Sequence, residues 1–154
     1  MHYLAKIFSL LGCILLIISV FVIFIAIIFR YFIGIALPWP EELTRFLYLW
    51  FTFCGVVVAE YKNYHLKVDA IFSYSGNKIK NIISILSLCI TFIFYIIAAY
   101  WGYDMTLFNY EMENRAVSMD LHLVWIWAAL PICLSAAALM AAYNLVRTVF
   151  SKKI

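Results

Sequence analysis

The chain has 154 residues, of which 68% are hydrophobic and only 12% charged, with a formal net charge of +3 and a mean hydropathy of +1.01. This composition excludes a soluble globular domain and indicates a protein that crosses a membrane several times. The basic residues are spread over the flanks of the apolar segments, so the small positive charge gives no indication of nucleic-acid binding.

Four apolar segments are long enough to cross a hydrocarbon core, which needs about 20 helical residues. We therefore predict an all-α membrane protein with a single membrane domain over residues 1–154 and four transmembrane helices, at roughly 7–29, 43–60, 82–103 and 121–146. The first segment is longer than the roughly 7–15 apolar residues of a signal peptide, and no small-residue cleavage site follows it. We expect it to stay in the mature protein.

The lysines and arginines predict the orientation of these spans. An even number of spans places both termini on one side of the membrane, together with the loop 61–81. That side carries most of the basic residues, whereas the other side carries Arg30, Arg45 and Arg115 among acidic residues. By the positive-inside rule, both termini and the loop 61–81 are predicted to be cytoplasmic.

The first span carries no charge after Lys6 and is apolar on every face. We expect such a helix to contact lipid all round or to pack as a featureless wall, without transport chemistry of its own. Arg30 and Tyr31 close the span, and an arginine beside an aromatic residue at a span end is a common interfacial anchor. The sequence therefore predicts that Arg30 is interfacial.

A stiff turn, Leu37-Pro38-Trp39-Pro40, leads into the second span, which is predicted to start at or just after the second proline. Glu41 and Glu42 fall in its first turn, at the positive end of the helix dipole, and Arg45 follows four and three residues later. One arginine at this spacing can bridge both acids. Two interpretations stay open: a charged helix start stabilised locally, with Trp39 in the interface, or a polar cluster that faces another subunit or a substrate.

The segment 60–81 is too polar to span a membrane but keeps apolar residues among its charges. This pattern predicts a short amphipathic helix on the cytoplasmic surface between spans two and three, ended by Ser75-Gly76-Asn77. His65 lies within it. A lone histidine without a second ligand at metal spacing favours an interfacial hydrogen-bonding residue over a metal ligand.

The third and fourth spans differ in composition. The third ends in an aromatic girdle, Tyr100-Trp101-Gly102-Tyr103, typical of a membrane interface. The fourth is rich in small residues, including Ser135-Ala136-Ala137-Ala138, and such residues let another helix approach closely. We expect it to be the main helix-packing surface, with a kink at Pro131. Between these spans, the polar loop 104–120 is predicted to be a connector or a docking edge.

The chemistry of an enzyme is missing from this pattern. The predicted spans hold no ionisable group at the membrane midplane, no paired histidines for haem, no nucleophile beside a base, and no inverted repeat of the kind that carriers use. The four cysteines all fall within predicted spans without a CxxC pair and are interpreted as small buried apolar residues: Cys13, Cys54, Cys89 and Cys133. We expect no catalytic residue, cofactor or metal.

The order of these features is that of a known family. A span ending in RYF, the turn PWPEELTRF, the continuation LYLWFTFCG and the polar stretch EYKNYHLKVD together resemble the small membrane subunit of tripartite ATP-independent periplasmic (TRAP) transporters, the DctQ-type or Q subunit. The resemblance covers nearly the whole chain and is most specific from Trp39 to Arg45, with Gly55 and His65 downstream. In one departure, Tyr64 stands where the family often has a glycine close before the histidine.

The resemblance implies a three-component importer in a bacterial inner membrane. A large multi-span (M-type) subunit would hold the ion and substrate sites, and a periplasmic binding protein would deliver small carboxylates such as C4-dicarboxylates, other organic acids or sialic acid. An ion gradient, usually of sodium, would drive uptake. This chain would be a non-catalytic scaffold, and Trp39, Glu41, Glu42 and Arg45 carry over as the matching cluster.

Two other hypotheses stay open. The chain could be a small homo-oligomeric carrier or exporter that uses Glu41, Glu42 and Arg45 as its site, provided that the acids face a water-filled cavity. It could also be a membrane-anchored assembly or signalling factor that binds a soluble cytoplasmic partner through the 61–81 surface.

Overall fold

The computed structural model describes residues 1–62 and 77–151. This part of the chain is helical and has no strand, and four of its helices are long and apolar enough to cross a membrane, so the predicted fold class is confirmed. The predicted surface helix between spans two and three falls largely on residues 63–76, and with His65 it lies outside the described residues.

The first two helices form a hairpin. Helix α1 (His2–Ile28) continues as the short π-helix η1 (Phe29–Ile33), which ends at Gly34 in a left-handed conformation with φ of 76°. Glycine adopts this conformation without steric strain. Helix α2 (Trp39–Tyr61) then begins one residue before the predicted start, with its proline in the first turn, where a missing N–H is harmless.

The sequence predicts that α1 contacts lipid all round or packs as a featureless wall, whereas in the structure one of its faces is a distinct packing face. Its buried residues include Ala5, Gly12 and Ser19, which are spaced seven residues apart and therefore share one face. A Cβ atom added at Gly12 would lie 3.6 Å from the Cβ of Cys54 on α2. Small residues thus bring α1 close to α2, while the large apolar residues of α1 stay exposed on its other faces.

The second hairpin consists of α4 (Asn77–Glu111), the short α5 (Val124–Trp127) and α6 (Ala129–Ser151). Helix α4 extends to Glu111, so the predicted loop 104–120 is wrong for residues 104–111, and the connection spans 112–123. Within this extension, the side chains of Thr106 and Asn109 donate hydrogen bonds to the backbone carbonyls four residues earlier, at 2.7 and 2.8 Å.

The predicted kink at Pro131 is a break three residues before it. Helices α5 and α6 are separated at Ala128, and a proline in this place lacks the N–H that would bond to Trp127 and crowds that carbonyl. Helix α4 approaches this break at Gly102, where an added Cβ would lie only 2.7 Å from the Cβ of Leu130. The glycine therefore allows a close contact between the two helices of this hairpin.

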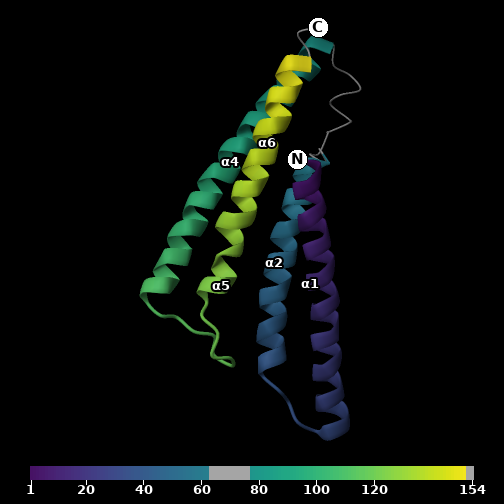
Figure 1. Cartoon of the computed structure of the whole chain (residues 1–154), viewed down its shortest axis with the longest axis vertical. Coiled ribbons are helices and arrows are strands. Elements are labelled where there is room, and N and C mark those ends of the chain that lie inside the picture. The colour runs from purple at the N-terminus through teal and green to yellow at the C-terminus, as the bar shows by residue number, and fades with distance from the viewer. Residues whose placement is uncertain (63–76, 152–154) are drawn as a thin grey trace.

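The two hairpins meet through α2 and α6 (Figure 1). Fully buried residues of this contact include Val57 on α2 and Ala137 and Ala141 on α6. Helix α6 is the most buried of the four, so the prediction that its small residues form the main packing surface is confirmed. The beginning of α1 and the end of α6 lie toward one end of the molecule, and the α1–α2 turn and the connection 112–123 lie toward the other.

Candidate functional site

The predicted polar cluster at the start of α2 contacts the connection between α4 and α5. The two carboxylate oxygens of Glu42 accept hydrogen bonds from the backbone N–H groups of Val117, at 3.0 Å, and Ser118, at 2.6 Å. A single side chain of the first hairpin therefore fixes a loop of the second one, 75 residues further along the chain. We call residues 112–123 the clasped loop.

The clasped loop folds as a small hairpin. The N–H of Ala116 donates to the carbonyl of Leu121, and the N–H of Leu123 donates to the carbonyl of Asn114, both at 2.9 Å. The side-chain amide of Asn114 also donates to the buried Asn109 of α4, at 3.1 Å. The loop is thus held by Asn109 near the end of α4, by bonds between its own two sides, and by Glu42 at its tip.

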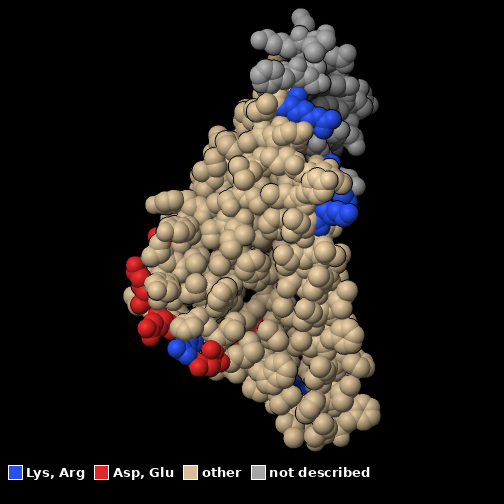
Figure 2. Space-filling model, in the orientation of Figure 1, with Lys and Arg blue, Asp and Glu red and all other residues tan. Residues whose placement is uncertain are grey.

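The clasped loop contains one ion pair and has an exposed tip. The guanidinium group of Arg115 pairs with the carboxylate of Asp120 and lowers the pKa of that carboxyl, first through the hydrogen bond and then through its charge. At the tip, the side chain of Val117 is 99% exposed. Acidic side chains gather toward this end of the molecule with some basic side chains among them, and other basic side chains lie toward the opposite end (Figure 2).

The structure divides the predicted cluster. Among the residues that the structure describes, no salt bridge within 4.0 Å joins Arg45 to Glu41 or Glu42. The bridge that the spacing allows is not formed, because Glu42 turns to the loop backbone. Glu41 instead lines a groove between α1 and α2, together with Arg30, the predicted interfacial residue.

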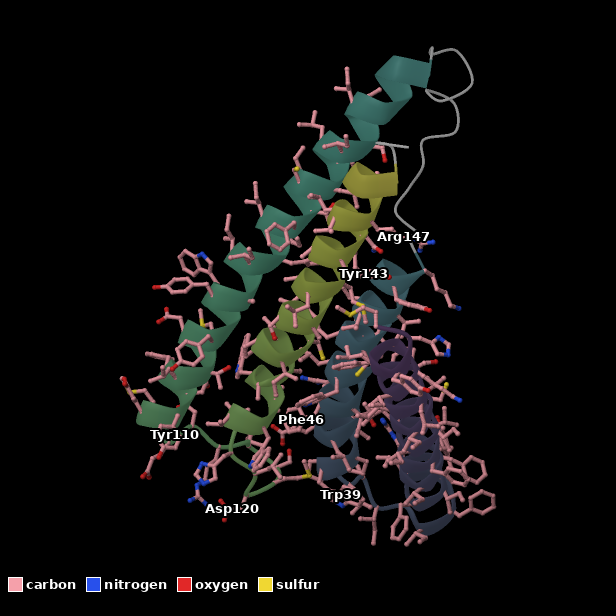
Figure 3. The ribbon with its side chains drawn as sticks, turned by 45° about the horizontal axis from the view of Figure 1, so that its top comes forward. Trp39, Phe46, Tyr110, Asp120, Tyr143 and Arg147 are labelled. Atoms are coloured by element: carbon pink, nitrogen blue, oxygen red, sulfur yellow. The ribbon has the colours of Figure 1, made fainter. Side chains whose placement is uncertain are left out.

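Two tryptophans of α2, Trp39 and Trp50, lie within or near this cluster. Trp39 is partly buried at the first residue of α2 and lies near the end where Asp120 is found (Figure 3). Three turns further along α2, the indole N–H of Trp50 donates to the backbone carbonyl of Trp125 at 2.9 Å. Helix α2 is therefore attached to the second hairpin by both the clasped loop and α5.

A second polar cluster, which the sequence interpretation missed, lies near the other end of the bundle. The side chain of Glu60, in the last turn of α2, is fully buried. Its carboxylate accepts hydrogen bonds from the hydroxyl of Tyr95 on α4 and from the side-chain amide of Asn144 on α6, each at 3.2 Å. The same amide donates to the backbone carbonyl of Glu60 at 3.0 Å. We call these three residues the three-helix node.

The sequence predicts no ionisable group at the membrane midplane, and the three-helix node places a buried carboxylate elsewhere, in the last turn of α2 at the end of the predicted second span. A buried carboxylate is tolerated because hydrogen bonds replace its water. The sequence did contain a signal: Glu60 ends an apolar helix, where the negative end of the dipole disfavours an acid, so a partner was required. The partners lie on other helices, and a single sequence gives no means of identifying them.

The metal-ligating residue types of the described ranges are not gathered at one place. In the described ranges 1–62 and 77–151, no three His, Cys, Asp or Glu side chains are placed to hold a metal ion. The four cysteines are free; Cys54 and Cys133 are buried as predicted, whereas Cys13 is exposed in this chain and Cys89 is intermediate.

Comparison with known proteins gives one family. The family described as "Tripartite ATP-independent periplasmic transporters, DctQ component" matches residues 19–151, which is most of the chain. No individual curated protein matches the sequence.

Proposed function

The chain belongs to the DctQ component family of tripartite ATP-independent periplasmic transporters, and from this premise we propose that it is the non-catalytic small membrane subunit of such an importer, in a bacterial inner membrane. It braces a large multi-span subunit, which carries the ion and substrate sites. The imported substrate is a small carboxylate, such as a C4-dicarboxylate, another organic acid or sialic acid, and an ion gradient drives its uptake. The family match carries this proposal.

The buried contacts of Glu60 and the exposed apolar surfaces of the helices support a scaffold role. Glu60 is enclosed by Tyr95 and Asn144, so its carboxylate serves the packing of three helices instead of an aqueous path. Large apolar side chains of α1 and α4 face outward along both helices. Such surfaces suit lipid on one part and the helices of a large membrane partner on another.

The clasped loop is the proposed contact with the periplasmic binding protein. It lies at the end that the positive-inside rule predicts to be periplasmic, and its backbone N–H groups donate to the carboxylate of Glu42 and to the backbone carbonyl of Asn109. A pre-organised loop with an exposed tip loses little conformational entropy when a partner docks. The contact is transient, because the binding protein must leave to collect more substrate.

The carrier hypothesis has less support. A substrate at Glu42 would have to displace the N–H groups of Val117 and Ser118, and Arg45 is not paired with either acid among the described residues. The hypothesis of a signalling factor depends on the 61–81 surface, most of which lies outside the described residues.

The deciding experiment is purification of the tagged chain from its native membrane in mild detergent, followed by mass spectrometry and liposome uptake assays. We expect a large multi-span partner to co-purify, and uptake to require that partner and the binding protein. A homo-oligomer that transports substrate alone, and loses transport in the E41Q/E42Q double variant, would contradict the scaffold and establish the carrier.

A further inference from the structure

A groove of about 400 Å³ lies between the end of α1 and the start of α2. On α1 and η1 it is lined by Ile23, Ala26, Ile27 and Arg30, whose spacing of three or four residues places them on one helix face. Every lining residue comes from the first hairpin, so the groove is a feature of that hairpin alone. In a membrane-spanning chain, such a groove is in contact with lipid unless a partner covers it.

The groove changes from apolar to charged along the helix axis. Seven residues separate Ile23 from Arg30, which corresponds to about 10 Å along a helix. The headgroup layer of one leaflet is about 5–8 Å thick, so the apolar part of the groove and its charged rim match the change from acyl chain to headgroup. Tyr31, largely exposed beside the rim, is a residue type that favours this interface.

The rim carries two opposite charges, and the described part of the chain offers no salt-bridge partner to either. Arg30 from η1 and Glu41 from α2 both line the groove, yet neither forms a salt bridge within 4.0 Å among the residues that the structure describes. The hydroxyl of Thr44, on the same wall, already donates to the carbonyl of Pro40 at 2.7 Å. The charged groups that the rim offers to a ligand are therefore one guanidinium and one carboxylate on opposite walls, with the hydroxyl of Tyr31 nearby.

We propose that this groove is a binding site for a phospholipid with an ethanolamine headgroup, whose phosphate contacts Arg30 and whose ammonium contacts Glu41. A guanidinium group binds phosphate with paired charge-assisted hydrogen bonds, and a primary ammonium can donate hydrogen bonds to a carboxylate. The headgroup thus complements both charges at once. A glycerol headgroup has no cation for Glu41, and a choline headgroup has no N–H to donate.

The site is tested by native mass spectrometry of the full chain, offered equal amounts of phosphatidylethanolamine, phosphatidylglycerol and phosphatidylcholine with identical acyl chains. We expect the ethanolamine lipid to be retained about five-fold more than either competitor, equivalent to about 1 kcal/mol. The R30Q variant should lose retention of all three lipids, whereas E41Q should lose only the preference for ethanolamine. Arg45→Gln and Glu111→Gln, exposed residues that do not line the groove, are matched controls.

Equal retention of the three lipids by the wild-type chain, or R30Q and E41Q spectra identical to those of the controls, would overturn the proposal. A photo-reactive residue in place of Ile27 gives an independent measurement in native membranes. A phospholipid adduct supports the site, and an adduct with a protein helix shows that a partner occupies the groove instead. The family assignment does not depend on either result.

Discussion

At the scale of single residues, Glu42 contributes most to the organisation of the predicted cluster. We predict that Glu42→Ala releases the backbone N–H groups of Val117 and Ser118, so that their hydrogen exchange accelerates by about ten-fold while the helices keep their protection. Hydrogen–deuterium exchange with mass spectrometry in detergent measures this. Glu41→Gln is the matched control, and unchanged exchange at the loop tip in E42A would disprove the clasp.

The pairing of Arg115 with Asp120 gives the loop a pH dependence. Because this pairing lowers the pKa of the folded carboxyl, its contribution is complete above the ordinary aspartate pKa and is lost as the pH falls through the lowered value. Carboxyl NMR of the labelled chain should therefore show Asp120 titrating below a normal aspartate. Arg115→Gln should return it toward the ordinary range, and a titration unaffected by this change would contradict the pair.

The three-helix node makes a prediction about stability. Asn144→Leu removes both donors that the amide gives to Glu60, and we expect it to destabilise the bundle by about 1–2 kcal/mol, with a smaller loss for Tyr95→Phe. Thermal unfolding in detergent measures both, with Tyr100→Phe, at an exposed residue, as the control. The double variant should lose less stability than the sum of the two single losses, since the Tyr95 hydroxyl and the Asn144 amide both donate to the carboxylate of Glu60. Strictly additive losses would count against a shared node.

At the scale of elements, the contact between α4 and α6 depends on the absence of a side chain at Gly102. We predict that Gly102→Ala destabilises the protein by about 1–3 kcal/mol, because its Cβ would overlap Leu130. Leu130→Ala in the same chain should restore part of the loss, since it makes the facing residue smaller. Gly55→Ala is the matched control: nothing lies within 4 Å of its added Cβ, so it should be neutral or stabilising by up to about 1 kcal/mol. Equal thermal stability of the two alanine variants would refute the close approach.

The helices themselves follow from the sequence to different degrees. Four apolar segments of spanning length predict four helices, and the alanines of α6 predict a packing face, because both signals are local. The length of α4 was underestimated, since Asp104 suggests a membrane boundary but does not end a helix. The packing face of α1 is not evident from the sequence, because Gly12 and Ser19 are small residues within a long apolar run, and the role of Gly12 is seen only from the position of Cys54 on α2.

At the scale of the whole molecule, the arrangement of the polar sites depends on how the two hairpins pack against each other. Residue spacing predicts neighbours within one helix, and on this basis Arg45 can bridge both Glu41 and Glu42. The partner that the structure shows for Glu42 is a loop 75 residues away, and the two residues that form the node with Glu60 are 35 and 84 residues away from it. Such contacts arise from the packing of α2 against α6, so a single sequence could identify the residue types of the sites but not their pairing.

The orientation of the molecule is open to a direct test. If the positive-inside rule holds, the clasped loop faces the periplasm and Lys6 faces the cytoplasm. In a chain whose four native cysteines are replaced, Val117→Cys should react with a membrane-impermeant maleimide in intact cells, because the side chain at this position is almost fully exposed. Lys6→Cys, on an exposed residue of α1, should react only after the inner membrane is permeabilised. The reverse pattern would place the clasped loop in the cytoplasm, where a periplasmic binding protein could not reach it, and would remove that part of the proposed function while leaving the family assignment in place.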